Sequence, residues 1–129
     1  MNDTIYALAT APGRAALAVM RLSGPDSRHI LSEMTGRPPP AARTLGLRDL
    51  RDPTGRLLDK ALVVWFRGPA SFTGEDVVEL HLLGGAAVVA ATAEALAAQG
   101  CRAAAPGEFT RRAFTNGRLS LAEAEGSQT

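Results

Sequence analysis

Residues 76–98 read DVVELHLLGGAAVVAATAEALAA, and this stretch decides the type of fold. Its first seven residues alternate apolar side chains with Glu79 and His81, the period of two that is typical of a β-strand. A pair of glycines then leads into an alanine-rich run before Gly100, which is the pattern of a helix with a glycine stop. A strand followed directly by a helix indicates a domain in which helices pack on a sheet.

Short apolar runs separated by turn sequences make up the rest of the chain. A Pro-Gly turn joins the first two runs, Asp52-Pro53-Thr54-Gly55 joins the next two as a hairpin, and three prolines at 38–40 form an extended connector. These elements predict an α+β fold, with helices packed on a mixed β-sheet. The expected strands are residues 4–9, 16–22, 45–50, 57–66, 76–82 and 101–105, and the expected helices are residues 26–34, 86–98, 108–114 and one from 121 onward.

The composition of the chain limits the classes of protein to which it could belong. A chain of 129 residues that is 46% hydrophobic can build one core, and a formal net charge of +1 gives no signature of a nucleic-acid or membrane binder. The single cysteine, Cys101, excludes an internal disulfide and leaves no cysteine cluster for a metal. The N-terminus does not have the pattern of a secretory signal, and the longest apolar stretch is too short to span a bilayer. We expect a cytoplasmic protein without membrane contact.

Lysine content bears on nucleotide binding. Lys60 is the only lysine, and it lies in the sequence Leu-Asp-Lys-Ala. A P-loop needs Gly-Lys-Ser/Thr after a glycine-rich turn, because the ammonium group must reach the β- and γ-phosphates. The chain therefore has no P-loop, and we expect no GTPase activity from it.

Two charged residues lie within predicted strands. Arg21 lies in a run that is otherwise apolar on both faces, so its guanidinium needs a partner: an internal salt bridge, water at the strand end, or a ligand carboxylate. Glu79 is either an exposed sheet carboxylate or an acceptor for the adjacent N–H donors of a flat heterocycle such as a pterin. His81 could share the Glu79 site.

A mixture of aromatic and basic residues follows at 109–118. It is either a platform for single-stranded RNA or, as the commoner case, a helix with Phe109 and Phe114 packed inward and its arginines in water. The helix at 86–98 is apolar around most of its circumference, so we expect a second chain to cover it, although exposed alanine is tolerated in water. Val88, Val89 and Leu96 favour the interface, because they add larger apolar surface.

Several motifs combine in order and spacing. The most specific are Ser-Phe-Thr-Gly-Glu-Asp at 71–76 and Pro-Gly-Glu-Phe-Thr at 106–110. Weaker ones lie at 3–5, 10–14, 21–24, 84–85, 112–116 and 122–125. Together they resemble the N-terminal part of the MnmE (TrmE) family of tRNA-modification GTPases, over essentially the whole chain.

The resemblance implies a fold similar to the tetrahydrofolate-binding domain of the glycine-cleavage T-protein. Residues 1–119 would form a folate-binding and dimerisation domain, and residues 120–129 the start of a helical domain, truncated before the GTPase domain. The implied cofactor is 5-formyl- or 5,10-methylene-tetrahydrofolate, while GTP, magnesium and potassium belong to the GTPase domain. The implied partners are a second copy, the flavoprotein MnmG (GidA), and tRNA through the full complex.

In that family the joint product is an aminomethyl or carboxymethylaminomethyl group at C5 of the tRNA wobble uridine. The family's folate contacts correspond to Arg21, Glu79 and Arg118, with Glu79 on the pterin and both arginines on the glutamate tail; no catalytic residue or metal ligand is implied. The sequence departs from the family at Arg118, usually lysine, at Ser120, usually aspartate, and at Leu83, usually histidine. The alternatives are a stand-alone folate-dependent one-carbon transferase and an RNA-binding module.

Overall fold

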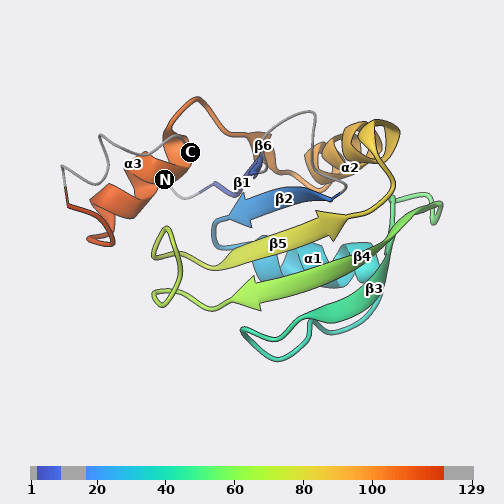
Figure 1. Ribbon diagram of the computed structural model, residues 1–129, viewed down its shortest axis with the longest axis horizontal. Coiled ribbons are helices and arrows are strands. Elements are labelled where there is room, and N and C mark those ends of the chain that lie inside the picture. The colour runs from blue at the N-terminus through green and yellow to red at the C-terminus, as the bar shows by residue number, and fades with distance from the viewer. Residues whose placement is uncertain (1–2, 10–16, 121–129) are drawn as a thin grey trace.

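The computed structural model describes residues 3–9 and 17–120 (Figure 1). The predicted turn at 10–14 and the predicted helix from 121 lie outside these residues. The predicted strands and helices within them are all present, with ends that shift by at most two residues. The strands are β1 (Ile5–Leu8), β2 (Ala18–Ser23), β3 (Gly46–Arg51), β4 (Leu57–Phe66), β5 (Val77–Leu82) and β6 (Arg102–Ala103); the helices are α1 (Ser27–Thr35), α2 (Ala86–Ala98) and α3 (Glu108–Thr115).

The strands form one mixed sheet in the order β3-β4-β5-β2-β1-β6. Neighbouring strands are antiparallel, except that β6 runs parallel to β1 at the edge. The predicted hairpin is the β3–β4 pair, and the first two predicted strands are antiparallel neighbours. The prediction of an α+β fold with a mixed sheet is therefore confirmed.

The hydrophobic core lies on one face of the sheet. Alternate residues of β2, β4 and β5 point to this face, as the period of a strand requires. Helix α1 covers it and lies behind the sheet in Figure 1, while α2 adds Leu96 to the same core. Each leucine-sized side chain buried here stabilises the fold by roughly 1.5–3 kcal/mol. The central members are Met20, Leu22, Ile30, Leu31, Met34, Val63, Trp65, Val78 and Leu80.

The opposite face of the sheet carries polar groups in register. Arg21 of β2 lies opposite Glu79 of β5, and Glu79 lies opposite Val64 of β4. In Figure 1 this face is turned toward the viewer, and within the described part of the chain no helix crosses in front of it. The two charged residues of the sequence prediction therefore lie on the face that α1 does not cover.

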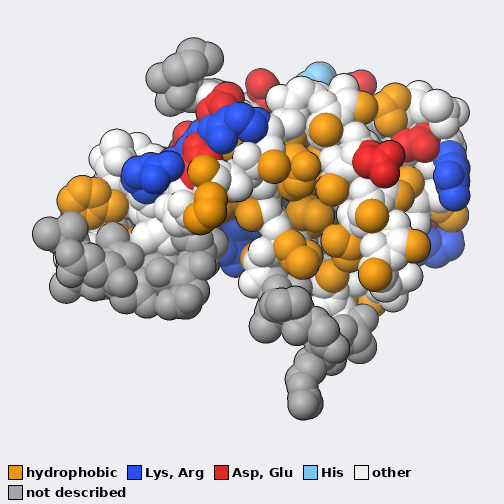
Figure 2. Space-filling view, turned by 90° about the horizontal axis from the view of Figure 1, so that it is seen from above, with side chains coloured by type: hydrophobic (Ala, Val, Ile, Leu, Met, Phe, Trp, Pro, Cys, Tyr) orange, Lys and Arg blue, Asp and Glu red, His pale blue; other side chains and the backbone are white. Residues whose placement is uncertain are grey.

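Helix α2 has the bounds that were predicted for it. It buries Thr92, Ala95 and Leu96, whereas most of its alanines are exposed and form an apolar surface over α2 in Figure 2. The expectation that a second chain covers this helix stays a prediction, but the assignment of Leu96 to that contact is wrong. Leu96 is fully buried in the chain's own core, and Val88 and Val89 pack against that core. The exposed members are Ala86, Ala87, Ala90, Ala97 and Ala98.

The lengths of the helices determine whether any of them could span a membrane. Among residues 3–9 and 17–120, no helix is long and apolar enough to cross a bilayer. The longest of those described, α2, has 13 residues, against the roughly 20 that a bilayer requires.

The burial of Leu96 gives a test of the fold. We expect Leu96→Ala to lower the free energy of unfolding by about 2–5 kcal/mol, because it leaves a cavity between α2 and the sheet. Ala97→Ser, at an exposed position of the same helix, should change it by less than about 0.5 kcal/mol. Urea unfolding measures both values, and equal stabilities for the two variants would contradict this packing of α2.

Candidate ligand-binding site

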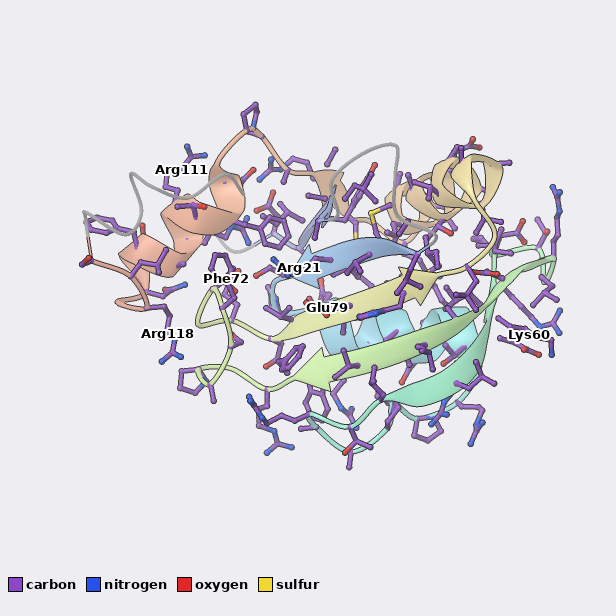
Figure 3. All side chains as sticks on the ribbon, viewed as in Figure 1. Arg21, Lys60, Phe72, Glu79, Arg111 and Arg118 are labelled. Atoms are coloured by element: carbon purple, nitrogen blue, oxygen red, sulfur yellow. The ribbon has the colours of Figure 1, made fainter. Side chains whose placement is uncertain are left out.

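The three site residues predicted from the sequence line one pocket. It has a volume of about 380 Å³ and lies between the exposed face of β2 and β5 and the loop at 67–76. This volume is within the range of sites for small organic ligands. In Figure 3, Arg21 and Glu79 lie close together on the sheet, Phe72 lies to their left, and Arg118 lies farther left, below α3. The other lining residues are Arg43, Phe66, Ala70, Ser71, Val77 and Leu119.

Arg21 and Glu79 form an ion pair across the two strands. Arg21 Nη2 lies 3.0 Å from Glu79 Oε2, and Nε donates to the same oxygen at 3.2 Å. The other oxygen of Glu79 lies 3.0 Å from His81 Nε2. The Arg21 guanidinium also lies 5.6 Å from the centre of the Phe72 ring. The internal salt bridge considered for Arg21 is thus present, and both of its members line the pocket.

Arg118 lies three residues after the end of α3 and contacts the loop that forms the pocket wall. Its Nε donates to the Ser71 carbonyl at 3.0 Å, while Asn116 Nδ2 donates to the Thr73 carbonyl at 2.8 Å. Gly74 packs so closely against this segment that an added Cβ would lie 2.8 Å from Asn116 Cβ. The end of α3 and the loop therefore hold each other in place.

The loop at 67–76 is built by the Ser-Phe-Thr-Gly-Glu-Asp motif itself. Ser71 Oγ donates to the Glu75 carbonyl, and Ser23 of β2 donates to Glu75 Oε1 at 2.7 Å. Ser23 also shares a hydrogen bond of 2.7 Å with the buried Thr73 hydroxyl. Asp76 Oδ1 accepts from the Gly68 amide at 2.8 Å. These bonds give the motif a structural role, which is to shape one wall of the pocket.

Arg43 is a pocket residue that the sequence analysis missed. It follows the proline connector and has a left-handed backbone, with φ of 66°. Its amide donates to the Trp65 carbonyl at 2.8 Å, and its side chain lies over Phe66 and donates to the Ala70 carbonyl at 3.4 Å. No local pattern marks this arginine, because its place in the pocket depends on the connector meeting the end of β4.

A network of ion pairs fixes α3 to the sheet. Arg112 contacts Asp3 at 2.6 Å and Glu75 at 3.1 Å, and Arg102 contacts Asp3 and Glu108 at 2.6 Å each. The hydrogen bond from Arg102 lowers the pKa of Asp3 to about 2 and the pKa of Glu108 to about 2. The Pro-Gly-Glu-Phe-Thr motif thus supplies Glu108 to this network.

The pattern at 109–118 was only partly interpreted correctly. Phe109 is buried as expected, but Phe114 is 44% exposed. Arg112, expected in water, has a side chain that is only 14% exposed because it is enclosed by carboxylates. Arg111 is exposed, as predicted.

Two of the three departures from the family pattern lie away from the pocket lining. Leu83 follows the end of β5, is 55% exposed, and donates its amide to Asp59 Oδ2 at 2.7 Å. Ser120 is exposed and is not part of the lining. Lys60 lies at the far end of the sheet in Figure 3 and pairs with Asp49 at 3.3 Å. Among these positions, only Arg118 lines the pocket.

Metal-ligating side chains do not cluster in the described part of the chain. Within residues 3–9 and 17–120, no group of three or more His, Cys, Asp or Glu side chains is arranged to hold a metal ion. Cys101 is buried, and its burial raises the pKa of the thiol to about 12. A thiol with this pKa stays protonated at neutral pH and is a poor nucleophile.

Comparison with known proteins identifies the family. The family model described as "GTP-binding protein TrmE N-terminus" matches residues 4–118. The chain belongs to this family. It is 59% identical over 128 residues to the tRNA modification GTPase MnmE of Methylobacterium sp. (strain 4-46), a match that covers 98% of the chain and 29% of the relative.

Other relatives give the same result. The chain is 56% identical over 126 residues to the tRNA modification GTPase MnmE of Phenylobacterium zucineum, covering 98% of the chain and 28% of the relative. It is 59% identical over 126 residues to that of Parvibaculum lavamentivorans, covering 96% of the chain and 29% of the relative. The chain therefore spans less than a third of the length of these relatives and matches the N-terminal family model.

The ion-pair network predicts a stability that falls in acid. A carboxyl whose pKa is lower in the folded state stabilises the fold above its unfolded pKa, near 4, and loses this contribution as the pH falls through the folded value. For Asp3 and Glu108 the loss should occur as the pH falls from about 4.5 toward 2. Thermal unfolding between pH 7 and pH 2.5 should show it.

Glu108→Gln tests the same network at neutral pH. It should lower the free energy of unfolding by about 1–3 kcal/mol and flatten the acid dependence, because Arg102 and Arg112 lose a charged acceptor. Glu94→Gln, at an exposed position of α2, is the matched control. An acid dependence in Glu108→Gln as steep as in the parent would show that Glu108 does not carry it.

Proposed function

We propose that this chain binds a reduced folate, 5-formyl- or 5,10-methylene-tetrahydrofolate, in the pocket lined by Arg21, Glu79 and Arg118. The observation that supports this most is the position of Glu79. Its carboxylate lines the pocket, is held by Arg21 and His81, and has a side chain that is only 18% exposed. A carboxylate oriented in this way accepts the paired N–H donors of a flat heterocycle.

The rest of the pocket fits the other parts of a folate. Phe66 and Phe72 contribute aromatic surface to its lining. Arg118 follows α3 on the far side of the loop, where it offers positive charge to a carboxylate tail. Arginine in place of the family's lysine keeps this charge but presents it as a planar fork.

For the whole protein, we propose a role in modifying tRNA. With the flavoprotein MnmG as partner, it would add a one-carbon-derived aminomethyl or carboxymethylaminomethyl group at C5 of the wobble uridine. The name of the relatives, tRNA modification GTPase, supports the tRNA substrate. GTP hydrolysis would belong to the remainder of the protein, since the only lysine of this chain, on β4, pairs with Asp49 on β3. We assign no bond-breaking step to the side chains described here.

The geometry weakens the RNA-binding alternative, because it removes two of the residues that suggested it. Of the residues that suggested it, Phe109 is buried and Arg112 is enclosed by Asp3, Glu75 and Glu108. A platform that stacks bases needs exposed rings beside available cations.

We also propose that the chain forms a homodimer. The alanine surface of α2 supports this, because an exposed face without large side chains allows two helices to approach closely. The uncovered face of the sheet, where Leu47 is 59% exposed, offers a second apolar surface.

The folate proposal is tested by calorimetry with 5-formyltetrahydrofolate. Glu79→Gln and Arg21→Ala should each weaken binding by about 2–5 kcal/mol, because each leaves the other charge of the pair without its partner. Lys60→Ala, at the far end of the sheet, should bind like the parent. If both pocket variants bind as well as the parent, or the parent binds no folate, the proposal fails.

Light scattering tests the dimer. At micromolar concentration the chain should have a two-chain mass, and Ala90→Glu should lower this mass by placing a charge on the exposed face of α2. Thr54→Glu, in the exposed β3–β4 turn, should leave it unchanged. A one-chain mass for the parent would contradict the dimer, and a dimeric Ala90→Glu would place the contact elsewhere.

A further inference from the structure

We infer that Arg43 and Arg118 form a two-arginine clamp that selects ligands ending in two carboxylates, such as the glutamate tail of a folate. The inference rests on the proposed folate function and goes beyond it by giving Arg43 a tail-binding role. It also limits Arg21 to the heterocycle end of the pocket, because Arg21 is bonded to Glu79.

The two guanidinium groups are anchored to neighbouring peptide groups of one loop. Arg43 Nη1 donates to the Ala70 carbonyl at 3.4 Å, and Arg118 Nε donates to the Ser71 carbonyl at 3.0 Å. Both residues line the same pocket although they are 75 positions apart in the sequence. A guanidinium has five N–H donors, so one bond to a carbonyl leaves donors for a ligand.

The charges of the pocket favour a dianion. Its lining contains three arginines and one glutamate, an excess of two positive charges. The glutamate is bonded to Arg21, whereas in the described part of the chain Arg43 and Arg118 have no ion pair with a carboxylate. Two carboxylates on one ligand would pair with both arginines, and a single carboxylate would leave one guanidinium without a carboxylate partner.

The backbone of Arg43 supplies an independent argument. Among the residues described, it is the one non-glycine residue with a positive φ, at 66°. This conformation is costly for a residue with a β-carbon and free of that cost for glycine. Strained conformations of this kind cluster at binding sites, where the side chain has a use that offsets the strain. Here the strain places the Arg43 side chain at the pocket.

The strained backbone of Arg43 makes it possible to remove its side chain without destabilising the fold. Because glycine adopts this backbone readily, Arg43→Gly should remove the side chain and leave the midpoint of urea unfolding at or above that of the parent. A loss of affinity in this variant would then be a loss of contact with the ligand. Arg37→Gly removes an exposed arginine at the start of the same connector, outside the pocket, and is the matched control for charge.

Binding is measured by calorimetry with two ligands, 5-formyltetrahydrofolate and 5-formyltetrahydropteroate, which lacks the glutamate. We expect the parent to bind the first more tightly. Arg43→Gly should weaken binding of the first by roughly tenfold or more and leave binding of the second nearly unchanged. Arg43→Lys, which keeps the charge without the fork, should recover part of the loss.

The outcomes separate this inference from the folate proposal. If the parent binds 5-formyltetrahydrofolate and Arg43→Gly binds it equally well, the clamp is wrong and the folate site stands. An equal loss for both ligands would also overturn the clamp, because Arg43 would then act on the pocket as a whole. If the parent binds neither ligand, the folate proposal fails and the clamp fails with it.

Discussion

The antiparallel register of β2 against β5 is the constraint on which the rest of this structure depends. It places Met20 and Leu80 together on the face that α1 covers, and it places Arg21 beside Glu79 on the opposite face. A shift of one residue would exchange the two faces, so that charges entered the core and leucines lined the pocket. The burial of apolar side chains on one face of the sheet therefore fixes the register that brings Arg21 and Glu79 together on the other face.

Contacts among α3, the loop before β5 and the sheet hold the wall of the pocket in place. Ser23 of β2 links the loop to the sheet, and Asn116 and Arg118 link it to the end of α3. Arg112 joins α3 to the same loop through Glu75. The pocket wall is thus supported by groups from distant parts of the chain. Changes at the end of α3 would reach the pocket through these contacts.

The pocket is polarised along its length in a way that suits an elongated, asymmetric ligand. One end has a neutralised pair, Arg21 with Glu79, supported by His81. The other end has two arginines, Arg43 and Arg118, that donate hydrogen bonds to backbone carbonyls. A flat heterocycle with N–H donors matches the first end, and carboxylates match the second. Charge placement would thereby set the direction in which such a ligand lies.

The sequence by itself determined the α+β class and the strands and helices, because periodicity is a local signal. The resemblance to the family implied that Arg21, Glu79 and Arg118 share one site, and all three line the pocket. The sequence did not reveal Arg43, whose place depends on the proline connector meeting the end of β4. For the same reason, the sequence analysis wrongly placed Leu96 at an interface with a second chain and Arg112 in water. Hydrophobicity and charge are properties of a residue, but whether Leu96 faces the core, or Arg112 meets three carboxylates, depends on contacts between segments distant in sequence. Only the tertiary structure decided those contacts.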